Sequence, residues 1–312
     1  MQCMEVWGGN RSIDAGVTLA GLDTWVYSRP FRAEGDQSGG GDIHYLSSCM
    51  SGRISRMLVA DVSGHGAAVD SVAVNLRDLM RKYVNYLDQS RFVQNLNVQF
   101  SSMARAGLFA TALVATYWVP TGTLVATNAG HPRPLIYRAA TGQWEFLDST
   151  ATDPRAAGTI SNLPLGVLEP TSYDQFSVKL DENDLVLIYT DSLVETRGSH
   201  GGLLGAEGLL QLLQGLDPRD PSRLVASLIA RLEAEQGSSE FADDVTCLLI
   251  RRNAVQPKYG LSSLVAGLKG VGGQLWERLL GRQTPVAWPE VTGQTVAAAL
   301  GRGAAPRGGH GS

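Results

Sequence analysis

The sequence predicts a single domain of mixed helices and strands, an α+β fold, from three observations. Residues 25–252 alternate short runs rich in β-branched and aromatic residues with stretches whose apolar residues recur at helical spacing. Short turns join two pairs of the β-rich runs, which indicates antiparallel hairpins. The 312 residues show no internal repeat, and a hydrophobic content of 44% is enough to bury a large core.

The first elements surround a conspicuous turn. Residues 57–60 form a short apolar run that stops at Asp61, which predicts a buried strand. After the glycines of residues 64–66, apolar residues recur at steps of three and four over residues 69–87, and this spacing predicts an amphipathic helix. Residues 92–103 keep the same spacing and predict a second helix.

Strands dominate the middle of the chain. Residues 110–118 and 123–127 flank a Pro-Thr-Gly turn, and residues 134–137 and 144–147 flank a Thr-Gly turn, so we expect two hairpins. Residues 148–163 are polar and contain proline and glycine, which predicts a surface loop.

The last third returns to alternating elements. Residues 185–189 are a continuous apolar run and predict a buried strand. An aspartate before Pro221 starts a helix whose leucines share one face, and Gly237 lies just past its end. Residues 245–250 predict the last core strand.

Three segments follow from this pattern. Residues 1–24 are expected to be a short N-terminal extension, residues 25–252 a single folded domain, and residues 253–312 a Gly- and Ala-rich basic tail with a disordered end. Within the tail, leucines of residues 261–280 fall at helical spacing beside basic residues, so a weak amphipathic helix could contact a membrane surface or a partner. Because glycines interrupt it, we favour a weakly ordered tail.

Charge and cysteine content narrow the function. Residues 254–312 carry six Lys/Arg against two Glu, which leaves the rest of the chain clearly acidic and argues against nucleic-acid binding. Three scattered cysteines predict neither a disulfide framework nor a zinc site, and Cys49 and Cys247 are interpreted as packing residues. No apolar run is long enough for a signal peptide or a membrane span, so we expect a cytoplasmic protein.

Four aspartates stand at turns or strand ends. Asp42 follows three glycines, Asp61 and Asp191 end apolar runs, and Asp243 precedes the last strand. Carboxylates with few Cys or His neighbours suit Mg²⁺ or Mn²⁺, which retain bound waters that can become nucleophiles. The pattern predicts metal-assisted hydrolysis.

A simpler interpretation remains open for each aspartate taken alone. Asp61 and Asp191 could cap the loops after their strands, which is the commoner role of a single aspartate. However, a charge at the end of a buried strand is unfavourable unless it is compensated. Four such sites, two of them beside glycines that let the backbone approach a ligand, favour a bound cation.

The same residues belong to seven motifs in a fixed order: Gly40-Gly41-Asp42, residues 58–66, Phe109-Ala110-Thr111, Asn128-Ala129-Gly130-His131-Pro132, Pro164-Leu165-Gly166, Thr190-Asp191 with Glu195, and Asp243-Asp244-Val245-Thr246. Over residues 25–252 their order and spacing resemble the SpoIIE-like bacterial branch of the metal-dependent (type 2C) protein serine/threonine phosphatases. The resemblance implies a four-layer α-β-β-α sandwich, in which helices flank two packed antiparallel sheets. It also implies two divalent cations, Mn²⁺ or Mg²⁺, at one end of the sandwich.

The resemblance further implies a set of oxygen ligands: Asp42, Asp61, the carbonyl of Val62, Asp191 and Asp243. Asp61 would bridge both ions. Asp42 and Val62 would complete one site, and Asp191 and Asp243 the other, with Asp244 as the second choice for that last place.

The implied reaction is attack on phosphoserine or phosphothreonine by a hydroxide that bridges the two ions. His65 could protonate the leaving oxygen because its pKa lies in the neutral range, or it could be only a turn residue, and the two interpretations are evenly balanced. His131, with Asn128 and Gly130, is expected to shape the loop beside the site. Arg53 and Arg133 could meet a substrate phosphate, but a solvated surface position is the commoner case.

Two departures from the family pattern bear on activity. Ser192 stands where a glycine usually follows the metal aspartate, so the loop would be strained if this position needs a positive φ. Tyr45 lies in a stretch that lacks a further aspartate common in the family. Either departure would suit a pseudo-phosphatase that binds a phosphoprotein without turnover.

The leading function is therefore a metal-dependent protein serine/threonine phosphatase. By family analogy, its substrate is a small phosphorylated regulator of the anti-sigma-factor antagonist type in partner-switching signalling. The alternatives are the pseudo-phosphatase and a small-molecule phosphohydrolase, since specificity resides in surface loops.

Overall fold

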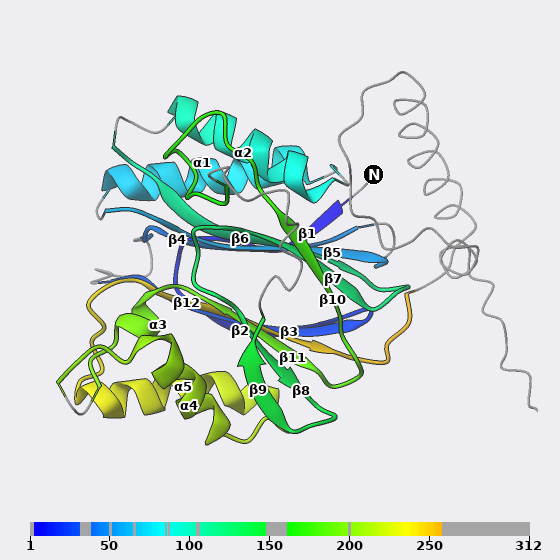
Figure 1. Cartoon of the computed structure of the whole chain (residues 1–312), viewed down its shortest axis with the longest axis vertical. Helices are drawn as coiled ribbons and strands as arrows, with labels where there is room; N and C mark the ends of the chain where they lie inside the picture. The colour runs from blue at the N-terminus through cyan, green and yellow to red at the C-terminus, as the bar shows by residue number, and fades with distance from the viewer. Residues whose placement is uncertain are drawn as a thin grey trace, which may run out of the picture.

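The computed structural model describes residues 3–31, 39–49, 52–64, 67–84, 86, 88–103, 107–147, 161–198 and 201–257. The chain forms two six-stranded sheets stacked face to face, with helices covering both outer faces (Figure 1). This arrangement confirms the predicted four-layer α-β-β-α sandwich. Within the described residues, no helix is both long and apolar enough to cross a membrane.

The first sheet has the strand order β1-β4-β5-β6-β7-β10 and is antiparallel throughout. Its strands are β1 (Cys3–Gly9), β4 (Asp42–Cys49), β5 (Ile54–Val62), β6 (Ala110–Trp118), β7 (Thr123–Ala129) and β10 (Gln175–Lys179).

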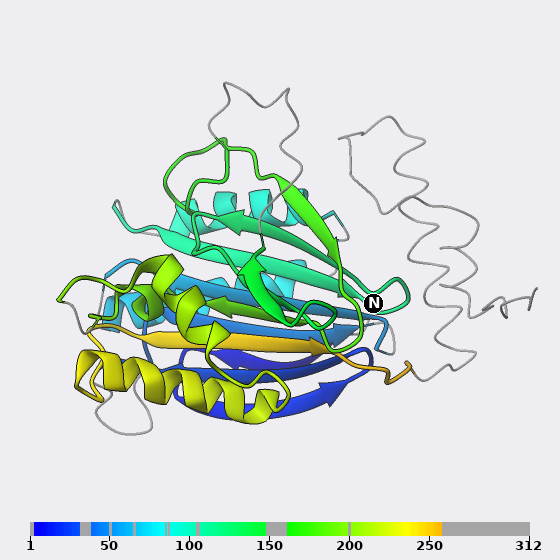
Figure 2. The same ribbon diagram turned by 60° about the horizontal axis from the view of Figure 1, so that its bottom comes forward.

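The second sheet has the order β2-β3-β12-β11-β8-β9 and is also antiparallel. Its strands are β2 (Ile13–Leu19), β3 (Leu22–Arg29), β8 (Leu135–Arg138), β9 (Gln143–Phe146), β11 (Leu185–Tyr189) and β12 (Val245–Arg252). Figure 2 shows the gold strand β12 lying within this sheet rather than at its edge.

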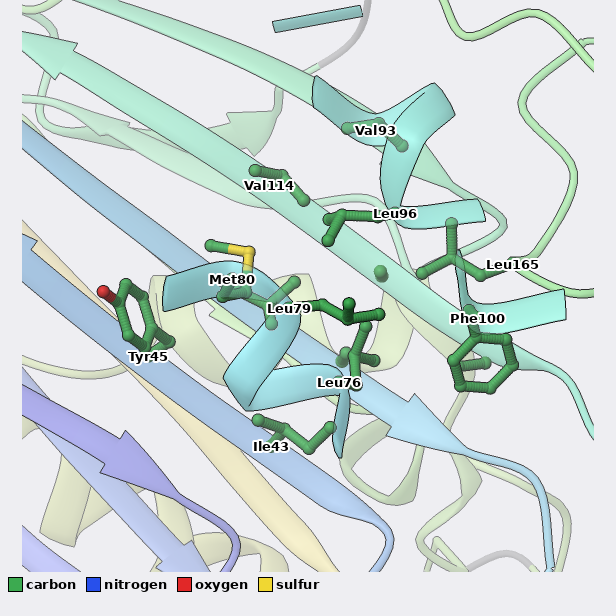
Figure 3. Close-up of a cluster of buried hydrophobic side chains, with 14 of the residues drawn as sticks. Ile43, Tyr45, Leu76, Leu79, Met80, Val93, Leu96, Phe100, Val114 and Leu165 are labelled. Carbon is green, nitrogen blue, oxygen red and sulfur yellow. The ribbon is translucent and has the colours of Figure 1, made fainter. Parts of the chain in front are cut away.

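Two helices, α1 (Ala67–Tyr83) and α2 (Gln89–Met103), cover the first sheet, and α3 (Ser192–Glu195), α4 (Gly205–Gln214) and α5 (Pro221–Gln236) lie on the side of the second. Each interface between layers holds its own apolar cluster. Beneath α1 and α2, side chains of the helices meet those of the first sheet, among them Ile43 and Tyr45 of β4 (Figure 3). Tyr45 therefore packs in the helix-covered core.

Several elements lie where the sequence predicts them. The strands β6 and β11 have the predicted limits, and both predicted hairpins are present as β6–β7 and β8–β9. The helix α5 begins at Pro221 and ends before Gly237, whose φ of 69° is left-handed. This conformation favours glycine and explains why the helix stops there.

The prediction that residues 1–24 form only a short extension ahead of the domain was wrong. Residues 3–9 and 13–19 form β1 and β2, which pair with β4 and β3 at one edge of the two sheets. As edge strands they are only partly buried, so they lack the continuous apolar runs that identify β6 and β11. The elements β3, β4, β10, α3 and α4 were also not predicted from the sequence.

The cysteine interpretation was wrong for Cys49, which is disulfide-bonded, and its Cα partner across the β1–β4 ladder is Cys3. Cys247 is a buried free thiol, as expected for a packing residue. The predicted loop of residues 148–163 falls mainly outside the described residues, and the predicted tail helix of residues 261–280 falls wholly outside them.

Candidate functional site

The first two predicted ligands are direct neighbours across the β4–β5 ladder. Asp42 opens β4, Asp61 stands near the end of β5, and their Cα atoms are paired in register. Side chains alternate between the two faces of a strand, so Asp61 shares the face of Met57 and Val59, which lie in the cluster between the sheets. By the same rule, Asp42 shares the face of Leu46. Both carboxylates therefore point into the space between the sheets at one end of the sandwich.

A threonine from the opposite sheet reaches Asp42. The hydroxyl of Thr190, just past the end of β11, donates to Asp42 Oδ2 over 2.8 Å, although 148 residues separate the two. The Thr190 hydroxyl also accepts from the backbone amide of Thr246 over 3.0 Å. Both threonine side chains are fully buried. The end of the β11–β12 pair is thus held directly over Asp42.

Asp191 follows Thr190 and lies at the N-terminus of the short helix α3. Ser192 is the first residue of this helix, so it has ordinary helical backbone. Among the described residues, the only non-glycine residues with positive φ are Asn162 and Asn183. The strain expected if Ser192 needed a positive φ is absent, and its hydroxyl instead donates to the carbonyl of Asp244.

Asp243 and Asp244 have different surroundings. Asp244 is buried, and its carboxylate accepts hydrogen bonds from the backbone amides of Phe31 (2.6 Å), Gly41 (2.5 Å) and Asp42 (3.2 Å). Asp243 is exposed, and its Oδ1 accepts from the backbone amide of Asp244 over 2.8 Å. The geometry makes Asp243 the more accessible carboxylate of the two.

The glycines before Asp42 allow close packing. A Cβ atom on Gly41 would lie 2.7 Å from the carbonyl oxygen of Val62, and one on Gly40 would collide with the Asp244 carboxylate. The amide of Val62 donates in turn to the Gly41 carbonyl over 3.2 Å. Only glycine lets this loop lie against the end of β5.

The carboxylates perturb one another. Burial raises the pKa of Asp61 to about 7, and the charges of Asp191 and Asp243 contribute to the shift. Burial also raises the pKa of Asp42 well above its ordinary value, with a further contribution from Asp61. The pKa of Asp191 is raised by burial and then by Glu195, one turn further along α3. These directions describe clustered negative charge that a cation would stabilise.

The donor set fits a hard divalent cation. Asp42, Asp61, Asp191 and Asp243 offer carboxylate oxygens, and Val62 offers a backbone carbonyl beside them. None of the ion pairs within the described ranges involves Asp42, Asp61 or Asp191. In the same ranges no group of three or more acidic, histidine or cysteine side chains is placed to hold a metal ion by itself, so backbone and solvent oxygens would have to supply the remaining ligands.

His131 has the supporting surroundings that the sequence predicts. The side-chain amide of Asn128 accepts from the His131 amide over 2.7 Å and donates to the His131 carbonyl over 2.8 Å, which closes the loop after β7. His131 Nδ1 lies 2.9 Å from the hydroxyl of Thr111, the ladder partner of Asp61. Burial lowers the pKa of His131 to about 3, so the ring is neutral at pH 7.

The other sequence candidates have different surroundings, and one of them lies outside the described residues. Arg53 is buried at the start of β5, the opposite end of the strand from Asp61. Arg133 stacks 4.0 Å over the Phe146 ring and lies 3.9 Å from Glu207 of α4. His65 lies outside the described residues.

Sequence reasoning gave no role to Thr190 or Glu195, and it treated Asp244 only as a substitute ligand. All three residues belong to the motifs, but nothing in the sequence indicates which contacts each of them makes. A hydroxyl that donates to a carboxylate 148 residues away can be recognised only after the chain has folded.

Comparisons with known proteins agree with this fold. Residues 51–253 match the family model described as stage II sporulation protein E (SpoIIE). The phosphoserine phosphatase RsbU of Bacillus subtilis (strain 168) is 24% identical over 232 residues, which are 74% of this chain and 63% of RsbU. The chain thus spans less than two thirds of the length of this relative.

Two solved structures share the fold. The PP2C phosphatase domain of SpoIIE from Bacillus subtilis, solved with a fragment of its regulatory domain, superposes with a TM-score of 0.61 at 17% identity, covering 77% of this chain and 64% of that one. RsbX in complex with magnesium superposes with a TM-score of 0.53 at 16% identity, covering 77% of this chain and all of that one. Since the family model spans more than half of the sequence, the protein belongs to the stage II sporulation protein E (SpoIIE) family.

Proposed function

We propose that the protein is a metal-dependent protein phosphatase that hydrolyses phosphoserine or phosphothreonine. The observation that carries the proposal is the meeting of carboxylates from both sheets, Asp42 and Asp61 with Asp191 and Asp243, at one end of the sandwich. Membership of the SpoIIE family and similarity to the phosphoserine phosphatase RsbU support the same activity.

The residues divide between two cation sites. Asp61 would contact both ions, because its pKa is raised by burial and then by the charges of Asp191 and Asp243, which come from the opposite sheet. Asp42 and the Val62 carbonyl would hold one ion, and Asp191 and Asp243 the other. Asp244 is the weaker candidate, since three backbone amides already occupy its carboxylate.

Two divalent cations, Mg²⁺ or Mn²⁺, would supply an activated water and neutralise the phosphate oxygens. The chain's own residues orient this site. Thr190 donates to Asp42 Oδ2 and so restricts the orientation of this carboxylate. Thr111 links the His131 loop to the strand position beside Asp61. We propose that His65 protonates the leaving oxygen of the substrate.

The pseudo-phosphatase alternative rested on Ser192 and Tyr45. Ser192 is helical and makes a hydrogen bond, and Tyr45 packs beneath α1 on the face of β4 opposite to Asp42. Neither residue now argues against turnover.

We further propose that the substrate is a phosphorylated protein rather than a free metabolite, of the small anti-sigma-factor antagonist type. The similarity to RsbU supports this class. Hydrolysis rates for a phosphoserine protein, a phosphoserine peptide and free nucleotides separate the possibilities. Faster turnover of nucleotides would replace the proposal with a small-molecule phosphohydrolase.

The experiment that tests the activity measures hydrolysis of p-nitrophenyl phosphate and of a phosphoserine peptide with Mn²⁺, with Mg²⁺ and with EDTA. Asp61→Asn and Asp191→Asn should reduce turnover to the level seen with EDTA. Asp217→Asn is the matched control, because Asp217 is exposed and pairs only locally with Arg219. Folded wild-type protein that binds metal but does not turn over would support the pseudo-phosphatase instead.

A further inference from the structure

Asp244 lies where three chain segments that carry proposed metal ligands come together. It follows Asp243 directly, and its side chain reaches the Gly40–Asp42 loop more than 200 residues away. Its carbonyl accepts the hydroxyl of Ser192, which follows Asp191. One buried residue therefore contacts the backbone of Asp42, adjoins Asp243 and accepts a hydrogen bond from the residue after Asp191.

Within the described ranges, the hydrogen bonds of the Asp244 side chain are to backbone amides. Oδ1 accepts from Phe31, and Oδ2 accepts from both Gly41 and Asp42. Hydrogen bonds to an ionised carboxylate are among the stronger ones in proteins. They fix the path of the main chain into Asp42, so the position of that carboxylate depends on Asp244.

Glycine is required at the contact. A Cβ on Gly40 would collide with the Asp244 carboxylate, and a Cβ on Gly41 would meet the carbonyl of Val62. The loop is therefore packed between Asp244 on one side and the end of β5 on the other. A loop packed in this way has little freedom to adjust if the contact from Asp244 is lost.

Ser192 adds a second tie. Its hydroxyl joins the start of α3 to the carbonyl of Asp244, and Ser192 is 5% exposed. A glycine at this position would lack that hydrogen bond. The serine thus gives this chain an additional link between the segments that carry Asp191 and Asp243.

Building on the proposed phosphatase function, we propose that Asp244 is a positioning residue that sets the spacing of Asp42, Asp191 and Asp243 for divalent cations, and that Ser192 reinforces it. Residues that orient metal ligands typically change metal affinity by about 10- to 100-fold when they are replaced. A purely structural role would lower stability without a specific effect on metal binding.

Asp184 provides a matched control. It is 1% exposed, and its carboxylate accepts from the backbone amides of Ala139 (2.9 Å) and Asp181 (3.0 Å) and from Arg138 (3.0 Å). Asp184 precedes β11, whereas Thr190 follows it, so the control lies at the opposite end of the sandwich. Asp184→Asn perturbs a similar buried carboxylate away from the site.

The test measures Mn²⁺ binding by calorimetry and by electron paramagnetic resonance, together with the melting temperature of each metal-free protein. Asp244→Asn should bind Mn²⁺ about 10- to 100-fold more weakly than wild type. The Mn²⁺ concentration that gives half-maximal activity should rise by a larger factor than the factor by which kcat at saturating Mn²⁺ falls. Ser192→Ala, which keeps the helical backbone, should weaken binding by about 2- to 10-fold, the effect of one hydrogen bond. Asp184→Asn should bind Mn²⁺ as wild type does.

Two results would overturn the positioning role and leave the phosphatase proposal intact. The first is an unchanged Mn²⁺ affinity in Asp244→Asn. The second is that Asp184→Asn, at the same loss of stability, loses as much Mn²⁺ affinity as Asp244→Asn. If Asp244→Asn does not fold, Ser192→Ala decides, because wild-type affinity in that variant would contradict the link to Asp244. A folded wild-type protein that binds no Mn²⁺ would overturn the metal site and the positioning role together.

Discussion

Replacing Thr190 by valine should destabilise the sandwich more than the loss of an ordinary buried hydroxyl. Valine keeps the shape of the side chain but removes the donor to Asp42 Oδ2 at 2.8 Å and the acceptor for the Thr246 amide at 3.0 Å. Each of these two hydrogen bonds contributes about 0.5–1.5 kcal/mol as a neutral bond. We therefore expect Thr190→Val to lower the free energy of unfolding by about 1–3 kcal/mol.

The control for this prediction is Thr116→Val. Thr116 is 2% exposed in β6, and its hydroxyl donates only to the side chain of Gln89 over 2.7 Å. Its replacement should lower the free energy of unfolding by about 0.5–1.5 kcal/mol. Urea unfolding in EDTA, followed by tryptophan fluorescence, measures both variants on the same scale. Equal losses in the two variants would refute the conclusion that Thr190 holds the two sheets together through Asp42.

Three further predictions use other parts of the molecule. Gly41→Ala should weaken Mn²⁺ binding in calorimetry by about 10-fold, because the new Cβ would lie 2.7 Å from the Val62 carbonyl oxygen. The control is Gly9→Ala, whose Cβ would have no atom within 4 Å and which should bind Mn²⁺ as wild type does. Burial raises the pKa of the Cys247 thiol to about 12, so its thiolate fraction at pH 8 should be about 1000-fold lower than that of an ordinary thiol. Peptide mass spectrometry should show that iodoacetamide does not label Cys247 in the native protein, and rapid labelling would contradict the buried position. Burial alone would raise the pKa of Asp23, but hydrogen bonds from Arg251, Asn253 and Thr18 outweigh burial and lower the pKa. Asp23 therefore stabilises the folded protein above its unfolded pKa of 3.8, and this stability is lost as the pH falls below that value. In acid unfolding experiments, Asp23→Asn should lack this pH-dependent loss of stability.

The predictable part of the fold consists of elements whose own residues define them. The runs that became β6 and β11 are buried on both faces and bounded by turns, so their limits could be predicted. The helix α5 carries proline at its start and glycine at its end. By contrast, β1 and β2 are edge strands whose pairing with β4 and β3 has no signal in the residues themselves.

The same division applies to the site. Asp42 and Asp61 could be proposed because they stand at turns and strand ends, and the structure pairs them across β4 and β5. Which of Asp243 and Asp244 is held by backbone amides could not be predicted, because the Asp244 carboxylate accepts from Phe31 and Gly41 more than 200 residues away. Contacts at that separation are a property of the topology and leave no local pattern.

The position of β12 affects how the chain can fold. Among the described residues this strand is the last along the chain, yet it lies between β3 and β11, and Arg252 pairs with Leu22. The second sheet therefore cannot close until almost the whole domain has been synthesised, and such distant pairings favour slow folding. A chain interrupted before residue 245 would leave β3 and β11 with open edges that can pair with other chains, so incomplete products should aggregate.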